Sequence, residues 1–313
     1  MKTKTFYVYM LVFCCSVFSF ATVILPRPMS VNEWLTTLSM WAAVGSVAAC
    51  LISDNRQTKP IADLISLVYL FLLLARRINS MNTYMKIYHR QTSAAGNILI
   101  TALTVIMITG YSNIKMEKLS APVCTAVIFM LVMAVLLNFS KANPINLYRN
   151  FNTDMTGYLG VTLFDYIIPA NIILNSSAQA DRKKSVSAIF ITTFVLITIT
   201  VYIFSCVKGD LLYSISPLQM VFQISAGMQI SNFDAYYNFL LWFSYFAVVM
   251  LIIHAYNSIK SRFSYFSRLD LLVIFPACFI VRRIDDRLWL PAMLVIAIVL
   301  VTGRKKAGYY EKV

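Results

Sequence analysis

Long runs of apolar residues separated by short polar stretches make up most of this chain. The first run extends over Phe6–Leu25 and the second over Trp34–Ile52, while the third covers Ile61–Ala75 and is followed by Arg76 and Arg77. Seven further runs cover Ile98–Tyr111, Ala121–Phe139, Gly157–Leu174, Val186–Val207, Phe233–Tyr256, Leu269–Val281 and Leu288–Thr302. Such runs indicate membrane-spanning helices, because about 20 apolar residues cross the hydrocarbon core of a bilayer.

The pattern predicts an all-α polytopic membrane protein with about ten transmembrane helices in one domain over residues 1–313. Each span must be a helix or part of a broken helix, since exposed backbone polar groups are too costly in hydrocarbon. The composition agrees, because 59% of the residues are hydrophobic and 13% are charged. Soluble domains have about 45–50% apolar and about 25% charged residues, so a soluble domain is excluded.

The net charge of +14 at pH 7 comes from basic residues scattered over many loops. They form no basic face interleaved with aromatic residues, so nucleic acid is not an expected partner. Anionic lipid headgroups and control of topology explain this charge more simply. The bias of Lys and Arg favours the side that holds both chain ends, and we expect both termini in the cytoplasm.

One connection is longer than a simple loop. Residues 208–232 contain an amphipathic centre, Pro217–Ile224, that is too short and too polar to cross the membrane. We expect this segment to be a helix lying in the outer interface. The apolar run at the N-terminus is longer than a typical signal sequence and has no A-x-A-like cleavage site, so we interpret it as a retained first helix.

Asp165 is the most informative single residue, because it falls near the middle of the sixth run. An acid at this depth costs about 2.5–3.5 kcal/mol on insertion scales and should therefore face protein or water. Gly157, Gly160 and Pro169 lie in the same run, as a broken helix requires. Asp165 is either a polar element of a central cavity or part of a structural ion pair or hydrogen bond.

Other polar residues have a functional and a structural interpretation. Arg76 and Arg77 are interpreted as snorkelling to the surface from a helix end, with burial against a carboxylate such as Asp165 as the alternative. Ser16, Ser19 and Thr22 recur every three residues and share a helix face, which serves either helix–helix hydrogen bonding or a cavity lining. No catalytic motif or metal-ligand spacing is present, so we expect neither an enzyme nor a metal or other cofactor.

The order of these pieces resembles the B subunit of spore germinant receptors, the GerAB-type germination permeases. The resemblance rests on Leu25-Pro26-Arg27, on Asn32–Leu35, on Ser216–Val221, on Gln229–Ala235 and on Leu241-Trp242-Phe243. Within these stretches, the residues that match the family motifs are Pro26, Pro217, Asp234 and Trp242. The chain resembles a divergent member, because it is shorter than typical relatives and has no glycine pair in its first helix.

This family belongs to the amino acid–polyamine–organocation superfamily. The resemblance implies a LeuT-like fold, with inverted five-helix repeats over about residues 1–150 and 151–313 and with helices one and six broken near the bilayer centre. The ligand would lie between these two helices. The residues expected to bind it are Ser16, Ser19, Phe20, Ala21, Thr22, Asp165 and Tyr166.

The resemblance also implies a function. We expect a non-catalytic membrane subunit of a nutrient receptor that triggers germination and sits in the inner membrane of the spore. Its partners would be the receptor's A and C subunits, a small nutrient such as an amino acid, and membrane lipids. A secondary amino-acid transporter and a scaffold subunit that binds no ligand are the alternatives.

Overall fold

The structure is a computed structural model of the whole chain. It describes residues 5–22, 31–52, 60–89, 94–111, 116–150, 166–176, 182–206, 218, 233–261, 263, 274–281 and 289–302. Every element in these residues is helical: α1 (Thr5–Thr22), α2 (Val31–Ile52), α3 (Pro60–His89), α4 (Ala94–Tyr111), α5 (Met116–Asn138), η1 (Phe139–Lys141), α6 (Pro144–Asn150), α8 (Ile167–Ser176), α9 (Arg182–Cys206), α11 (Phe233–Lys260), α12 (Ile274–Val281) and α13 (Trp289–Thr302). The prediction of an all-α protein is confirmed for this part of the chain.

Each of the ten apolar runs overlaps one of these helices, and the short helices η1 and α6 were not predicted. Within the described residues, three helical stretches are long and apolar enough to cross a membrane: Lys118–Lys141, Lys183–Cys206 and Ala235–Lys260. The chain therefore has the features of a membrane protein. The described part of α8 has 10 residues and α12 has 8, both shorter than a full crossing.

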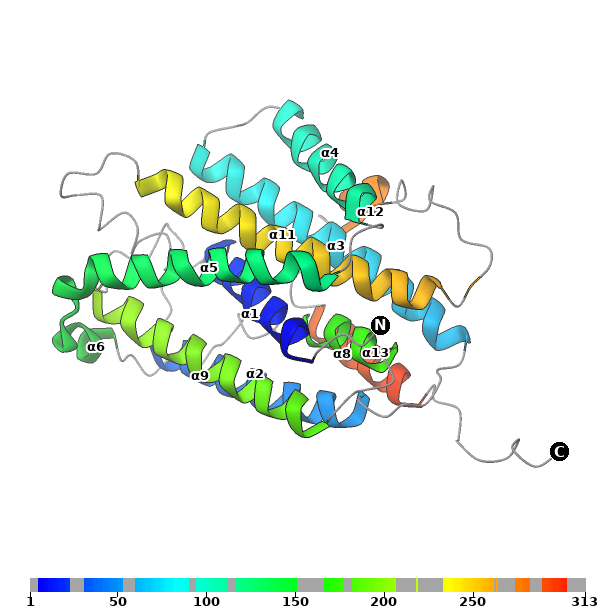
Figure 1. Cartoon of the computed structure of the whole chain (residues 1–313), viewed down its shortest axis with the longest axis horizontal. Helices are drawn as coiled ribbons and strands as arrows, with labels where there is room; N and C mark the ends of the chain where they lie inside the picture. Colours follow the sequence, from blue (N-terminus) through cyan, green and yellow to red (C-terminus); the bar gives the residue numbers. More distant parts are fainter. Residues whose placement is uncertain are drawn as a thin grey trace.

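α11 contacts α1, α3, α4, α5 and α8, whereas α9 runs beside α2 along one edge of the bundle (Figure 1). The protein buries 72% of the apolar window of α11 but only 33% of those of α5 and α9. The exposed faces of these two helices carry large apolar side chains, among them Phe129, Val132 and Leu136 on α5 and Phe190 and Phe194 on α9. An apolar exterior of this kind fits contact with lipid, since soluble monomers rarely expose large apolar patches.

α3 is longer than its apolar run. It continues from Pro60 to His89, so Arg76 and Arg77 lie near the middle of a 30-residue helix of about 45 Å. Packing against α11 and α12 supplies the contacts that the sequence pattern alone does not reveal. A longer third helix thus carries both arginines into the protein.

Several helices end against a side chain from another helix. The last four carbonyls of a helix have no partner within it, and hydrocarbon offers none. The Tyr237 hydroxyl donates to the Ala21 carbonyl of α1, and the Tyr202 hydroxyl donates to the Val135 carbonyl of α5, over 2.8 Å and 2.6 Å. Asn79 likewise donates to the Cys278 carbonyl of α12 over 2.7 Å. These bonds join the helices while they satisfy their ends.

α2 packs closely on α8 and α9, and a glycine permits the approach to α8. Gly45 lies in the middle of α2, and a Cβ at this position would overlap the Cδ1 atom of Ile167 in the first turn of α8. Small residues at helix interfaces of membrane proteins allow such close approach. Gly45 therefore fixes how near α2 lies to the start of α8.

Candidate functional site

The start of α8 lies inside the protein. Tyr166 precedes the helix, and its carbonyl accepts the first intrahelical bond from the Ala170 N–H over 3.2 Å. Pro169 therefore lies in the first turn, where no N–H is needed for the helix and its fixed φ is compatible with it. The predicted interruption between Asp165 and Ala170 is absent from the described residues, because α8 continues from Ile167 through Pro169. Asp165 itself lies outside the described residues.

α1 and the start of α8 are joined by two side-chain hydroxyls. The Oγ atom of Ser19 lies 2.9 Å from the phenolic oxygen of Tyr166, and both residues are buried. Closer to the N-terminus of α1, the Tyr9 hydroxyl donates to the Oδ1 atom of Asn171 over 3.5 Å. The earlier residue of α1, Tyr9, therefore contacts the later residue, Asn171, while the later residue of α1, Ser19, contacts Tyr166 at the start of α8. The two helices thus run antiparallel.

The three small hydroxyl residues of α1 do not share one role. Ser16 donates to the Val12 carbonyl and Thr22 donates to the Phe18 carbonyl, each over 2.9 Å within α1. Such bonds to the preceding turn satisfy a hydroxyl without a second helix. Only Ser19 reaches another helix in the described structure. α1 is unbroken from Thr5 to Thr22, so a break in helix one is absent from these residues.

Arg77 projects from α3 to the same place. Its Cζ atom lies 4.8 Å from the centroid of the Tyr166 ring, which is the geometry of a cation–π contact. The side chain is only 2% exposed and that of Arg76 is 5% exposed. The interpretation of both arginines as snorkelling to the surface is therefore wrong. The longer α3 places them within the bundle, whereas snorkelling requires a position near a helix end.

Two buried tyrosines form a layer at the C-terminal end of α1. Tyr84 of α3 and Tyr237 of α11 are both buried, with ring centroids 6.0 Å apart. Tyr237 bonds the Ala21 carbonyl, as described above, so its hydroxyl lies at the negative end of the α1 dipole. The interior of the bundle is thus polar as well as aromatic at the level of Ser19 and Ala21.

On the other side of Ser19, Phe18 contacts α11. The rings of Phe18 and Tyr245 have centroids 5.4 Å apart, and the Tyr245 hydroxyl lies 2.6 Å from the Thr104 hydroxyl of α4. Trp242, one of the residues on which the family resemblance rests, packs edge-on against Tyr245 with centroids 6.0 Å apart. Trp242 therefore lies at the edge of the same aromatic group.

Among the residues that the sequence singled out, the structure brings together Ser19 and Tyr166, and the Ala21 carbonyl accepts from Tyr237. Ser16 and Thr22 are buried nearby with their hydroxyls bonded to α1 itself. The predictions for Asp165, Pro26 and Pro217 lie outside the described residues, as do those for the side chains of Phe20 and Asp234.

Sequence reasoning missed Arg77, Tyr84, Tyr237 and Tyr245 as members of this group. The charge of Arg77 directly after an apolar run was a signal for it. The tyrosines gave none, since buried tyrosines are common in any helical core.

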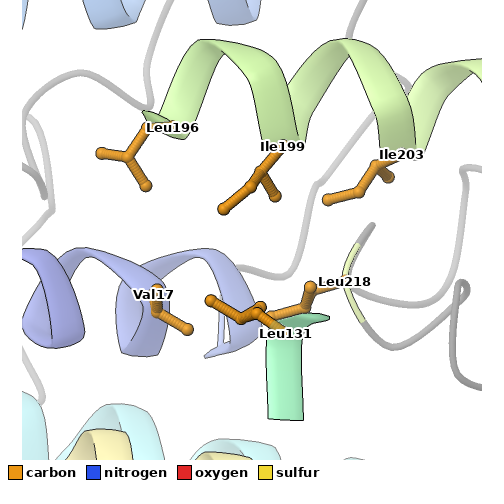
Figure 2. Close-up of a pocket in the computed structure, with 6 residues that line it drawn as sticks. All are labelled: Val17, Leu131, Leu196, Ile199, Ile203 and Leu218. Atoms are coloured by element: carbon orange, nitrogen blue, oxygen red, sulfur yellow. The ribbon is translucent and has the colours of Figure 1, made fainter. Parts of the chain in front are cut away.

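The described cavity lies on the opposite face of α1 from Ser19. It is lined by Val17 of α1, Leu131 of α5, the α9 residues Leu196, Ile199 and Ile203, and Leu218 (Figure 2). Its volume is about 10 Å³, which is about the smallest space that holds one water molecule, and the side chains that line it offer no hydrogen-bond partner. Leu218 is the one described residue of the segment 208–232, and it is buried here, at 3% exposure. The cavity is a small apolar void and not a site for a polar nutrient.

The polar group between α1, α3, α8 and α11 is therefore the candidate site. It offers a buried cation, tyrosine hydroxyls and two helix ends of opposite polarity, which suit recognition of a small polar molecule better than covalent chemistry. A comparison with models of protein families and a comparison with curated proteins find no match to this chain.

Proposed function

We propose that this chain is the membrane subunit of a nutrient receptor that triggers spore germination, and that it binds a small nutrient, such as an amino acid, where α1 meets the start of α8. It acts with the receptor's A and C subunits in the inner membrane of the spore. The family resemblance of the sequence gives the receptor class. The single structural observation that carries the ligand site is the buried contact between Ser19 and Tyr166.

The helix contacts support an inverted five-plus-five repeat. In such a repeat α1, α2, α3, α4 and α5 correspond to α8, α9, α11, α12 and α13. Several contacts recur between the corresponding helices, whereas the contacts of α1 with α11, of α1 with α5, of α3 with α4 and of α2 with α13 have no counterpart of similar extent among the described residues. The contact of α1 with α9 has its counterpart in the contact of α8 with α2. The contact of α4 with α11 has its counterpart in the contact of α12 with α3. The contact of α5 with α11 likewise has its counterpart in the contact of α13 with α3. In addition, each of the first three helices contacts the helix that corresponds to it, which gives the pairs α1 with α8, α2 with α9 and α3 with α11. Antiparallel packing of α1 on α8 is also what inversion requires.

The distribution of lysines supports a cytoplasmic location for both termini. The starts of α1, α5 and α9 lie at one end of the bundle together with the end of α11 (Figure 1). Lys118, Lys183 and Lys184 belong to the first turns of α5 and α9, and Lys260 ends α11, whereas Lys86 belongs to the last turn of α3 and Lys141 to η1. The end of α3 and η1 lie toward the other end of the bundle (Figure 1). Positive residues concentrate on the cytoplasmic side of membrane proteins.

A receptor is favoured over a transporter because the described first helix is continuous. Transporters of this architecture bind substrate at discontinuous helices whose rearrangement accompanies transport. In this chain α1 has no glycine, runs unbroken to Thr22 and satisfies two of its hydroxyls internally. Such a helix suits ligand sensing. The same fold could serve a secondary amino-acid transporter, and a subunit with a closed site would serve as a scaffold.

Deletion of the gene in the spore former that carries it separates these functions. We expect loss of germination on one class of nutrient, tested with a panel of amino acids, sugars and nucleosides. Restoration by the wild-type gene but not by a gene encoding Ser19→Ala together with Tyr166→Phe would tie the response to the site. Unchanged germination of the deletion strain, combined with amino-acid uptake by the purified protein in vesicles, would show a transporter instead.

A further inference from the structure

The hydroxyl of Ser185, in the first turn of α9, is buried without a hydrogen bond. Its side chain is fully buried, and its Oγ atom has no partner at hydrogen-bond distance and angle in the part of the chain that the structure describes. By contrast, Thr192, Thr193 and Thr200 of the same helix each donate to the carbonyl four residues earlier. Native proteins leave few buried polar groups unpaired, so a hydroxyl of this kind points to a bound water, ion or ligand.

Two more buried oxygen atoms lie beside this hydroxyl. The Tyr9 hydroxyl of α1 is close to the Ser185 side chain but outside the geometry of a hydrogen bond. It reaches the Oδ1 atom of Asn171 in α8 only over 3.5 Å, whereas a hydroxyl usually bonds an oxygen over about 2.7–2.8 Å. Three polar side chains from three helices therefore meet with one long bond among them, and much of their capacity for hydrogen bonding is unused.

The packing of α2 against α8 and α9 places two of these side chains at one level. Ile167 of α8 and Ile189 of α9 both meet α2 at Gly45. Asn171 lies one helical turn from Ile167 toward the end of α8, and Ser185 lies one turn from Ile189 toward the start of α9. A short connection joins that end to that start. The meeting of Asn171 and Ser185 thus follows from the helix register as well as from their shared neighbour on α1.

We propose that one water molecule binds at this junction and joins α1, α8 and α9 through Tyr9, Asn171 and Ser185. The water accepts hydrogen bonds from the two hydroxyls and donates one to the Oδ1 atom of Asn171. The Nδ2 atom of Asn171 already donates to the Ile167 carbonyl over 2.9 Å, which leaves Oδ1 as the acceptor. Three bonds of this kind are the usual number for a buried water.

A water molecule fits this junction better than a cation does. The three side chains are neutral, and Lys183 and Lys184 precede Ser185 in the same turn of α9. A buried charge in a protein is normally paired with an opposite charge, which these side chains do not supply. The junction is separate from the ligand site at Ser19 and Tyr166, so the proposal does not depend on the receptor function.

The first test measures unfolding of the full-length chain in mixed micelles of detergent and denaturant. Ser185→Ala removes the hydroxyl and leaves the rest of the side chain in place. Loss of an unpaired buried hydroxyl would stabilise the protein, whereas loss of a hydroxyl that holds a water should destabilise it. We expect the equilibrium constant for unfolding to rise about threefold, which is the average effect of one interhelical hydrogen bond in a membrane protein.

A second variant and a matched control assign this effect to the shared water. Tyr9→Phe should also raise the equilibrium constant for unfolding. Because both hydroxyls bind the same molecule, the double variant should raise it by less than the product of the two single effects. The control is Thr193→Val on the same helix, whose hydroxyl donates to the Ile189 carbonyl within α9 and should contribute little.

The second test detects the water directly. X-ray pulses split bound water into hydroxyl radicals, which oxidise the side chains next to it, and mass spectrometry of the full-length chain in lipid nanodiscs locates the oxidised residues. We expect Tyr9 to be oxidised faster than Tyr245, which is also buried and whose hydroxyl lies directly against that of Thr104 over 2.6 Å. Ser185→Ala should lower the oxidation of Tyr9 to the level of Tyr245.

Three results would overturn the proposal. The first is a Ser185→Ala variant that is as stable as the wild type or more stable, and the second is oxidation of Tyr9 no faster than that of Tyr245. The third is a wild-type protein that sodium or potassium ions stabilise against choline at equal ionic strength, with the effect lost in Ser185→Ala. That result would assign the junction to a cation instead of a water.

Discussion

The hydroxyl of Ser19 and the hydroxyl of Tyr166 lie 2.9 Å apart although 147 residues separate them in the sequence. This contact joins α1 to the residue at which α8 begins, so it fixes one helix against the end of another. It also positions the Tyr166 ring, which contacts the Arg77 guanidinium. The polar centre of the protein is thus organised around one pair of hydroxyls.

Loss of this pair should have a measurable coupling energy. We expect Ser19→Ala and Tyr166→Phe each to destabilise the protein, and the double variant to cost less than the sum of the two. Interhelical hydrogen bonds in membrane proteins contribute about 0.6 kcal/mol on average and about 1.7 kcal/mol at most. Unfolding in mixed micelles of detergent and denaturant measures these values. Ser16→Ala is the control, because its hydroxyl bonds only within α1, and strictly additive effects of the first two variants would contradict the contact.

Tyr237→Phe should uncap the end of α1. The substitution removes the donor to the Ala21 carbonyl and leaves a buried acceptor unsatisfied, which costs about 1–3 kcal/mol. The adjacent variant Tyr236→Phe removes a hydroxyl from a residue that is 48% exposed and should cost less than about 0.5 kcal/mol. The comparison of their unfolding free energies is the measurement. Equal stabilities of the two variants would show that the carbonyl finds another partner.

Gly45→Ala should destabilise the contact between α2 and α8. The new Cβ overlaps the Cδ1 atom of Ile167, and overpacking of a tight interface costs about 1–3 kcal/mol. Ile167→Val removes this atom, so Gly45→Ala should cost much less in that background. The reciprocal rescue is measured with the four proteins of a double-mutant cycle. Ala43→Val on the exposed face of α2 is the control and should be tolerated. A full cost of Gly45→Ala in both backgrounds would mean that Ile167 does not limit the approach.

The two ends of the bundle should differ in their access to the cytoplasm. In a background with all six native cysteines replaced, we expect Lys184→Cys to react with a membrane-impermeant maleimide only in inside-out vesicles. Lys141→Cys should react only in right-side-out vesicles, because Lys141 belongs to η1, which follows α5 at the end of the bundle opposite the start of α9 (Figure 1). The reverse pattern would invert the proposed topology and place the bias of lysines on the outer side, against the usual rule.

Asp165→Asn should change the response to nutrients more than it changes assembly with the A and C subunits. The prediction rests on sequence alone, since Asp165 lies outside the described residues, and its reason is that an acid in an apolar run must face protein or water. Germination of spores that carry the variant measures the first effect, and co-purification of the partner subunits measures the second. Normal germination together with lost assembly would assign Asp165 a structural role.

The positions of the helices could be read from the sequence with few errors. Apolar runs such as Ala121–Phe139 and Val186–Val207 coincide closely with α5 and α9, because the only stable conformation of such a run in hydrocarbon is a helix. The prediction failed for the length of α3, where two arginines interrupt the apolar pattern at Arg76. A helix continues through charged residues when neighbouring helices enclose them, and neighbours are not encoded in a local pattern.

The sequence by itself determined that this chain is an all-helical protein with apolar, lipid-compatible faces, and it placed Ser16, Ser19 and Thr22 on one side of the first helix. Only the tertiary structure decided that Ser19 alone of these bonds a residue outside α1, that Arg77 contacts the Tyr166 ring, and that Tyr84 and Tyr237 meet at the end of α1. The physical reason is that helical periodicity fixes which side chains share a face. The position and angle at which two helices cross are instead set by packing between residues that lie far apart in the chain, such as Gly45 and Ile167.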